Sequence, residues 1–347
     1  MIPTNDPKIA FISDHLRTDD LDPTLPSGGL PLHSSSGLGK LFDAMLKAAG
    51  VQRSKCLITS VFNLRPMENN IDNILVPKKA GAAGWPKLKQ GKYCPPALLP
   101  EIKRLYGELE AFQPDLIIPL GSTALWSVTG ATGLSNRHGF LHSYRGIPVI
   151  PTWHPDTVMK KYTNFMVAVN DIRRAVGYAK GEILEEKFEY VEEAGLEDIA
   201  RLKAMIKPSD WISVDIETKP KYRSITCIGL GTKDFSICVN MWDPRKPNQS
   251  WWPDVESEVA AMHAIQDILL MPNTKVGQNF LYDCTWLRAV WGMEIHGPVI
   301  DTRLMHFALF PELPHSLAEL ASTYLTMPSW KALHAGFEND SAESSGE

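Results

Sequence analysis

Short apolar runs alternate with helical patterns through the first half of the chain. The runs are Lys8–Ser13, Lys55–Phe62, Asp115–Leu120 and Ile147–Thr152. The clearest helical pattern between them is Gly37–Gly50, where apolar residues recur every three or four positions until a glycine ends the pattern. Strands that alternate with helices in this way form a mainly parallel sheet with helices on both faces. The first half therefore predicts a three-layer α/β/α domain.

A charged stretch, Gly181–Lys187, separates this region from a second mixture of strands and helices. We expect two α/β domains, covering residues 1–182 and 187–335, because domains usually contain about 100–200 residues. The polar, acidic segment 336–347 is expected to be a disordered tail. The predicted elements of the second domain include strands at Trp211–Ile216, Ile225–Leu230 and Phe235–Asn240 and helices at Gly195–Ile206, Val255–Leu270, Leu281–Trp291 and Thr302–Leu309.

Composition narrows the class of protein. The chain has 347 residues, a net charge of −5 and five cysteines without a C-x-x-C pair. An odd number of unpaired cysteines is typical of a reducing compartment and argues against a disulfide framework. No apolar stretch predicts a signal peptide or a membrane span. We therefore expect a soluble, cytoplasmic protein. The acidic balance does not exclude nucleic acid as a partner, because a local basic groove is enough to bind it.

Two carboxylates end an apolar strand in the second half. Asp215 and Glu217 are two positions apart, so strand periodicity places both side chains on one face. Close carboxylates repel each other, and a divalent cation removes that penalty. Oxygen ligands suit Mg²⁺ or Mn²⁺. The alternative is a solvated strand end without a metal.

A third carboxylate follows about sixty residues later, in the segment Gly277–Asp283. Asn279 is placed to begin a helix, and Asp283 lies one turn into that helix, able to face the same site as Asn279. The alternative is an ordinary capped helix with an exposed aspartate.

These motifs occur in a distinctive order: D-I-E-T at 215–218, G-x-N-x-x-x-D at 277–283, D-T at 301–302 and H-S-L-A-E-L-A at 315–321. The series resembles the proofreading 3′–5′ exonuclease of family A DNA polymerases over about Phe188–Lys331. The resemblance implies an RNase H-like α/β fold in which Asp215, Glu217 and Asp283 bind two metal ions. It also implies that Glu217 helps to position the attacking water and that Asn279 contacts the terminal nucleotide.

One motif of that family is missing. The family ends its site with a tyrosine or histidine followed four residues later by a final aspartate. Here His334 is followed by Glu338 at four residues and by Asp340 at six. We therefore expect an incomplete metal site. Either the chain is a fragment of a longer polymerase-like protein or the nuclease is crippled.

Polar motifs follow several strands of the first half, where open α/β folds place their sites. They are Ser13–His15, Thr59–Pro66 and Pro151–Pro155. Each alone is typical of a loop. In order, together with Gly29–Phe42 and Pro114–Ala124, they resemble the uracil-DNA glycosylase superfamily, closest to family 4, over about Lys8–Ala179.

This second resemblance implies an enzyme that flips a base into a pocket and cleaves its N-glycosidic bond. His154 would stabilise the leaving base anion, and Asp14 would position water. The expected base pocket contains Leu32, Ser60 and Asn63. Ser60 stands where the family has the asparagine that reads uracil, and Leu32 stands where an aromatic residue stacks on the base. The cluster-binding cysteines of the family are absent, so we expect no iron–sulfur cluster.

Basic residues could track the DNA backbone. The candidates are Arg145, Lys160 and Lys161, and the two lysines directly follow the His154 loop. The alternative is a solvated surface.

The leading hypothesis is a phage-encoded, two-domain DNA repair and replication protein that acts on single-stranded DNA or 3′ ends. It could be the N-terminal part of a phage DNA polymerase. The alternative is a catalytically degenerate module that binds DNA or recruits a polymerase. The Ser60 and Leu32 positions and the missing final aspartate favour this alternative.

Overall fold

The computed structural model describes residues 6–22, 24, 29–77, 85–89, 92–183, 189–246 and 249–325. It divides into two compact units. The first is Met1–Glu186 together with Ala318–Glu347, and the second is Lys187–Leu317. The expected tail 336–347 and the residues His334, Glu338 and Asp340 lie outside the described part of the chain.

The first unit is built on a five-stranded sheet with the order β2-β1-β6-β8-β7. Neighbours pair in parallel except β7, which returns antiparallel to β8 through a turn at Arg145-Gly146. Both turn residues have positive φ, 49° and 83°, as a tight hairpin requires. This hairpin was not predicted. The strands are β1 (Ile9–His15), β2 (Leu57–Phe62), β6 (Leu116–Pro119), β7 (His142–Tyr144) and β8 (Ile147–Val149).

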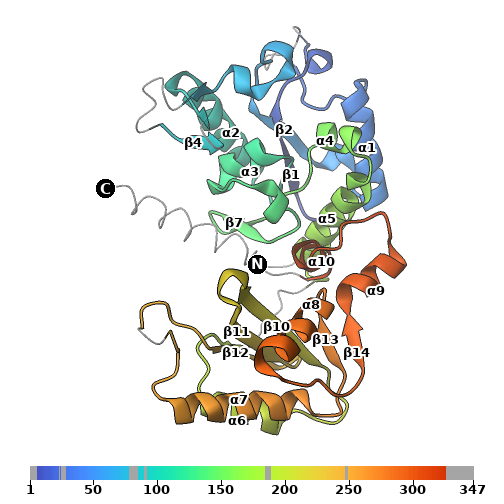
Figure 1. Ribbon diagram of the computed structural model, residues 1–347. Helices are drawn as coiled ribbons and strands as arrows, with labels where there is room; N and C mark the ends of the chain where they lie inside the picture. Colours follow the sequence, from blue (N-terminus) through green and yellow to red (C-terminus); the bar gives the residue numbers. More distant parts are fainter. Residues whose placement is uncertain are drawn as a thin grey trace. The chain divides into compact units, whose positions relative to one another are not determined.

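Successive residues of β1 face two separate cores, because side chains alternate along a strand. Ile9 and Phe11 pack on one side, and Ala10 and Ile12 pack on the other. Figure 1 shows α1, α4 and α5 on one side of this sheet and α2 and α3 on the other, so the predicted three-layer α/β/α fold is confirmed. The helices are α1 (Gly37–Ala49), α2 (Leu99–Phe112), α3 (Ser122–Thr129), α4 (Pro155–Lys160) and α5 (Asn164–Ala179).

The ends of α1 show how local sequence sets a helix. The Ser36 hydroxyl accepts a hydrogen bond from the Gly39 N–H at 3.0 Å and caps the first turn. Gly50 ends the helix in the left-handed conformation, at φ 74°. A Cβ at Gly39 would meet the His33 carbonyl oxygen at 1.8 Å, so the preceding loop can cross the helix only at a glycine.

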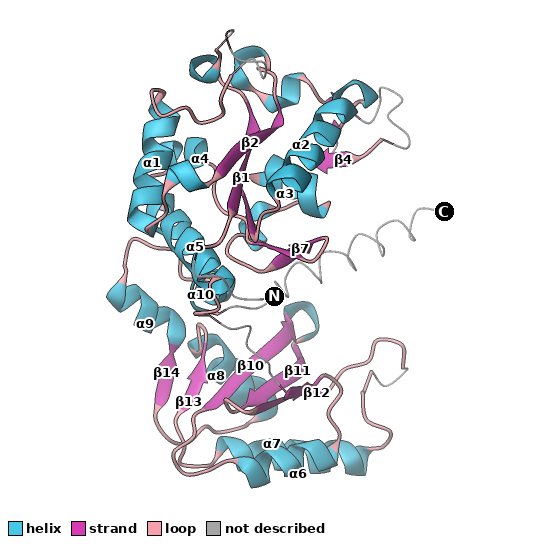
Figure 2. Cartoon of the chain, turned by 180° about the vertical axis from the view of Figure 1, so that it is seen from behind, coloured by secondary structure: helices cyan, strands magenta, loops and turns pink. Residues whose placement is uncertain are grey.

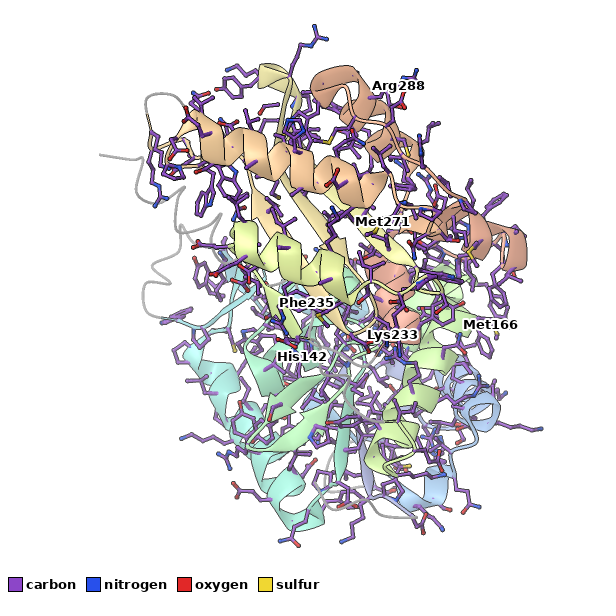
Figure 3. The ribbon with its side chains drawn as sticks, turned by 90° about the horizontal axis from the view of Figure 1, so that it is seen from below. His142, Met166, Lys233, Phe235, Met271 and Arg288 are labelled. Carbon is purple, nitrogen blue, oxygen red and sulfur yellow. The ribbon has the colours of Figure 1, made fainter. Side chains whose placement is uncertain are left out.

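The second unit is built on a mixed six-stranded sheet with the order β14-β13-β10-β11-β12-β9. In Figure 3, α6 and α7 lie across one face of this sheet, with Phe235 beneath α6. The strands are β9 (Glu189–Val191), β10 (Ile212–Lys219), β11 (Ser224–Gly231), β12 (Phe235–Asn240), β13 (Lys275–Gly277) and β14 (Val299–Asp301). The helices are α6 (Leu196–Met205), α7 (Val255–Leu269), α8 (Leu281–Trp286) and α9 (Thr302–Leu309).

The predicted helix Leu281–Trp291 is two elements in the structure. After α8, residues Leu287–Trp291 form one turn of π-helix, which ends at Gly292 with φ 67°. A π-turn inserts an extra residue into the helical repeat, and periodicity over so few residues does not distinguish it from an α-helix.

Two further segments complete the described chain. A small sheet with the order β3-β5-β4 lies between β2 and α2 in the sequence of the first unit, and Figure 2 labels its strand β4. Its strands are β3 (Val76–Pro77), β4 (Lys87–Lys89) and β5 (Lys92–Tyr93). Helix α10 (Leu317–Tyr324) contains the last five residues of the H-S-L-A-E-L-A motif, and from Ala318 onward it groups with the first unit. No helix in the described ranges is both long and apolar enough to cross a membrane.

Candidate active sites

The first candidate site joins the carboxyl ends of two strands. Asp14 lies near the end of β1, and His154 follows β8 at the N-cap of α4. The Nε2 atom of His154 lies 3.3 Å from Asp14 Oδ1 and 3.0 Å from Ser13 Oγ. The two residues predicted to act on the glycosidic bond are therefore in direct contact.

The hydrogen bonds of His154 define its tautomer. The backbone N–H of Asp156 donates to His154 Nδ1 at 3.1 Å, so the proton of the neutral ring is on Nε2. Burial lowers the pKa of His154, and the Asp14 carboxylate only partly opposes that shift. His154 is therefore a neutral donor whose N–H lies at the Asp14 side of the ring.

Asp14 is held in its ionised form. Burial alone would raise the pKa of Asp14, but His154, His15 and the Arg17 guanidinium together lower it. Arg17 Nη2 lies 3.4 Å from Asp14 Oδ2 and 3.9 Å from Asp156 Oδ2, so it bridges the end of β1 and the first turn of α4. The resemblance did not single out Arg17.

A polar cavity of about 590 Å³ opens beside Asp14 and Arg17, and His154, which is 5% exposed, lies behind Asp14 and is not among its lining residues. Lys160 lines it and pairs with Asp156 at 2.7 Å, while the adjacent Lys161 is exposed. The cavity is lined by Asp14, His15, Arg17, Glu68, Asn69, Asn70, Ile71, Asp156 and Lys160.

The expected base-pocket residues do not line this cavity. Leu32 is 1% exposed and belongs to the apolar core, with φ at 54°. Ser60 is 0% exposed, and its hydroxyl lies 2.6 Å from Asn63 Oδ1 and 3.1 Å from the Phe62 carbonyl oxygen. Only Asn63 is partly exposed. Leu32 therefore packs in the apolar core, and Ser60 is buried with its hydroxyl bonded inside the protein.

Arg145 lies away from this site. It occupies the turn before β8, whereas His154 follows the opposite end of that strand. Its Nη1 pairs with Glu110 at 2.5 Å. The structure thus brings Lys160 to the cavity and leaves Arg145 at the other edge of the sheet.

The second candidate site lies on β10. The strand alternates between buried and exposed residues: Ile216 packs into the core, while Asp215 and Glu217 share the opposite face, as predicted. Burial raises the pKa of Asp215, and the neighbouring Glu217 carboxylate raises it further.

Asp283 approaches the same strand from α8. Its Oδ1 accepts the Ile216 N–H at 3.0 Å, across 67 residues of sequence. Burial raises the pKa of Asp283 to about 6, against the lowering effect of that hydrogen bond, and the Asp215 carboxylate adds to the increase. Asp215 therefore lies close enough to both Glu217 and Asp283 for charge repulsion to raise a carboxyl pKa in each pair.

Asn279 does not begin the helix. It has φ 58°, and α8 starts at Leu281 with Phe280 at its N-cap. The Asp301 carboxylate instead accepts the N–H groups of Asn279 and Phe280 at 3.0 and 2.9 Å. The side-chain oxygen of Asn279 accepts from Arg303 at 2.9 Å. The helix-start expectation was wrong because a carboxylate from another strand supplies the acceptor.

In this structure the three carboxylates do not form a complete set of metal ligands. Within the described residues, no group of three histidine, cysteine, aspartate or glutamate side chains is arranged to hold an ion. One Asp283 oxygen is already used by the Ile216 amide. The donor set nevertheless fits a hard divalent cation, because mutual repulsion and burial both raise the pKa of Asp215 and Asp283.

A cavity of about 420 Å³ covers the open face of this sheet beside Asp215. Gln278, Thr302 and Leu317 also line it, and the Thr302 hydroxyl bonds to the Gln278 side chain and to the Gly277 carbonyl at 3.1 Å. The D-T motif was noted in the sequence, but the position of Gln278 in the cavity was not predicted.

Comparisons with known proteins agree with this division. Residues 7–173 match the uracil DNA glycosylase superfamily, and residues 191–335 match the 3′–5′ exonuclease family of DNA polymerase A. A type-4 uracil-DNA glycosylase from Thermotoga maritima is 26% identical over 149 residues, which is 42% of this chain and 67% of that protein. The DNA polymerase of Bacillus phage SP01 is 35% identical over 65 residues, which is 18% of this chain and only 7% of the polymerase.

Among solved structures, the catalytic core of RRP6 from Trypanosoma brucei is 20% identical, with a TM-score of 0.30. The match covers 40% of this chain and 35% of that chain.

Proposed function

We propose that this chain, which joins a domain of the uracil DNA glycosylase superfamily to a 3′–5′ exonuclease domain, is a DNA-processing enzyme. The observation that carries the proposal is the contact of His154 Nε2 with Asp14, which lines a polar cavity. A neutral imidazole N–H can stabilise a leaving base anion and an ionised carboxylate can orient water, and the two groups meet at the carboxyl ends of parallel strands, where α/β folds place their sites.

In the proposed glycosylase reaction, His154 donates its Nε2 hydrogen to the oxygen on which the leaving base develops negative charge. The Asp156 N–H holds the ring in the tautomer that can donate. Asp14 orients a water toward the sugar carbon that the base leaves, and its carboxylate favours positive charge on the sugar. Arg17 keeps Asp14 ionised and in place.

Base excision is tested by incubating the protein with single-stranded DNA that contains one uracil, followed by alkali. We expect strand cleavage at the uracil and none in DNA that contains thymine at that position. Uncleaved uracil DNA would rule out uracil as the substrate, and the same assay with other damaged bases would then identify the base.

In the proposed exonuclease reaction, Asp215, Glu217 and Asp283 would hold Mg²⁺ or Mn²⁺, and a bound ion would supply Lewis-acid stabilisation of the attacking water and the leaving 3′-oxygen. Glu217 also positions the attacking water, and Asn279, held by Arg303, contacts the terminal nucleotide. We expect Mn²⁺ uptake, measured by calorimetry, to disappear in Asp215→Ala. Uptake by that variant equal to uptake by the wild type would place the ion elsewhere.

A second candidate function is a degenerate module that binds DNA or recruits a polymerase. It is favoured by the burial of Leu32 and Ser60, which leaves neither free to read a base. The excision and Mn²⁺ uptake assays distinguish the two functions. A degenerate module binds single-stranded DNA but neither excises a base nor takes up Mn²⁺ through Asp215.

The match to a phage DNA polymerase supports a place in replication. We propose a phage-encoded protein of the host cytoplasm in which a glycosylase-like unit inspects DNA next to a proofreading unit. The coding sequence downstream of Glu347 tests this directly. A histidine or tyrosine followed four residues later by aspartate, and then polymerase motifs, is the expected result. A stop codon there would overturn the link to a longer polymerase.

A further inference from the structure

Helix α10 contacts the first unit through an ionic contact between partly exposed Glu319 and buried His138. Glu319 Oε2 lies 3.1 Å from His138 Nε2, and Asp171 Oδ2 lies 3.2 Å from His138 Nδ1. His138 is 1% and Asp171 2% exposed, so the imidazole is enclosed between two carboxylates. In the chain, the whole second unit separates Glu319 from His138 and Asp171.

The surface beneath α10 is shaped for this helix. Ser322 is 1% exposed and packs on Gly139. A Cβ at Gly139 would lie 2.8 Å from the Ser322 carbonyl oxygen and 2.6 Å from Asp171 Oδ1, so only glycine permits the approach. Arg174 of α5 donates a hydrogen bond to the Leu325 carbonyl oxygen at the end of the helix. Shape, charge and backbone capping therefore all contribute to binding α10.

The same contacts reach the loop that carries His154. The His138 ring packs on Trp153, with ring centroids 5.1 Å apart. The Thr152 hydroxyl donates to Asp171 Oδ2 at 2.7 Å, on the same carboxylate oxygen that contacts His138. Thr152 and Trp153 directly precede His154, so Glu319 is connected to the first candidate site through two adjoining side chains.

We propose that α10 is an intramolecular clasp: a helix whose sequence belongs to the exonuclease family segment binds the glycosylase-like unit through His138 and holds the Thr152–His154 loop in place. The clasp consists of contacts within the first unit: Glu319, Ser322 and Leu325 lie against His138, Gly139, Asp171 and Arg174. Only the significance of the loop rests on the proposed function, since the docking of α10 does not depend on any activity.

The clasp is tested by hydrogen exchange, followed by mass spectrometry, on the full chain. Glu319→Gln removes the charge that faces buried His138, whereas Glu312→Gln removes the same charge from an exposed position in the segment between α9 and α10. His138 is buried, so removing the charge of one of its two carboxylate partners is expected to weaken the docking of α10. We expect faster exchange in residues 318–325 and 150–156 of Glu319→Gln, and exchange like the wild type in Glu312→Gln.

Wild-type exchange of residues 318–325 in Glu319→Gln would overturn the clasp. Faster exchange there with an unchanged loop at 150–156 would overturn the coupling to His154. A second variant, Ser322→Arg, introduces a large side chain against Gly139 and is expected to expose the same two segments. No DNA is present in these measurements, so their failure is distinct from the absence of glycosylase or nuclease activity.

The clasp also predicts a pH dependence of stability. Burial alone would lower the pKa of His138, but the facing carboxylates of Asp171 and Glu319 raise it to about 10. A raised pKa means that the stabilisation is complete below the unfolded value of about 6.5 and is lost as the pH rises toward 10. We expect the difference in melting temperature between the wild type and His138→Gln to shrink from pH 6.5 to pH 10. A difference that grows over this range would contradict a protonated His138.

Discussion

Replacement of His154 by alanine is expected to lower the rate of base excision by about 10²–10³-fold, the usual effect of removing one donor to a developing oxyanion. The loss should appear in kcat, because the Nε2 hydrogen acts on charge that exists only in the transition state. His154→Gln, which can place an amide N–H near the Nε2 position, should recover part of the rate. Single-turnover cleavage of uracil-containing single-stranded DNA measures all three proteins.

The matched control for this prediction is His263→Ala, which removes an exposed histidine from α7 in the other unit. It should excise bases at the wild-type rate. Because His154 is buried and caps α4, circular dichroism must first show that the His154 variants are folded. A folded His154→Ala protein with the wild-type rate would remove this residue from the proposed mechanism.

Asp215→Asn is expected to lower Mn²⁺-dependent release of 3′ nucleotides by about 10²–10⁴-fold. Metal ions contribute several kcal/mol to transition-state stabilisation in such sites, and each 1.36 kcal/mol corresponds to a factor of ten. The substitution preserves the shape of the side chain but removes the charge that faces Glu217. The measurement is digestion of single-stranded DNA with a label near its 3′ end.

Asp234→Asn serves as the control, since Asp234 is exposed in the turn between β11 and β12 and pairs with Lys233. It should retain full activity. Equal activity in the wild type and Asp215→Asn would mean that nuclease action, if present, uses another group.

The local features of the fold were accessible from the sequence. Strand alternation placed Asp215 and Glu217 on the face opposite the core, and the structure has them there. The predicted bounds Thr302–Leu309 agree with α9, because Asp301 caps the first turn through the Arg303 N–H at 2.8 Å. Strand alternation and helix capping are set by residues a few positions apart, so both features can be predicted from the local sequence.

Features that depend on contacts between residues far apart in the chain could not be predicted from local sequence patterns. The docking of α10 depends on His138 and Gly139, which lie a whole unit away in the chain. The role of Asn279 as a helix start was overridden by Asp301, whose carboxylate takes the backbone donors. Leu32 was expected at a base pocket but lies in the core, because a residue type matched to a motif carries no information about burial.

The charges around the first site keep Asp14 and His154 in different protonation states. Asp14 lies between His154 and Arg17, so its charge is stabilised while the adjacent imidazole stays neutral. Groups whose environments separate their protonation states in this way can act as acid and base at one pH. The second site lacks such balance, since burial and repulsion raise the pKa of both Asp215 and Asp283. A cation is the natural partner of that arrangement.

One substrate tests the joining of two activities most directly: a single-stranded DNA with one internal uracil, a 5′ label and a different 3′ label. In EDTA, followed by alkali, we expect cleavage at the uracil with the 3′ label still attached to its fragment. In Mn²⁺ we expect release of the 3′ label as well, abolished by Asp215→Asn but not by His154→Ala. A protein that binds this DNA but leaves both labels in place under both conditions would contradict the account and identify a degenerate module.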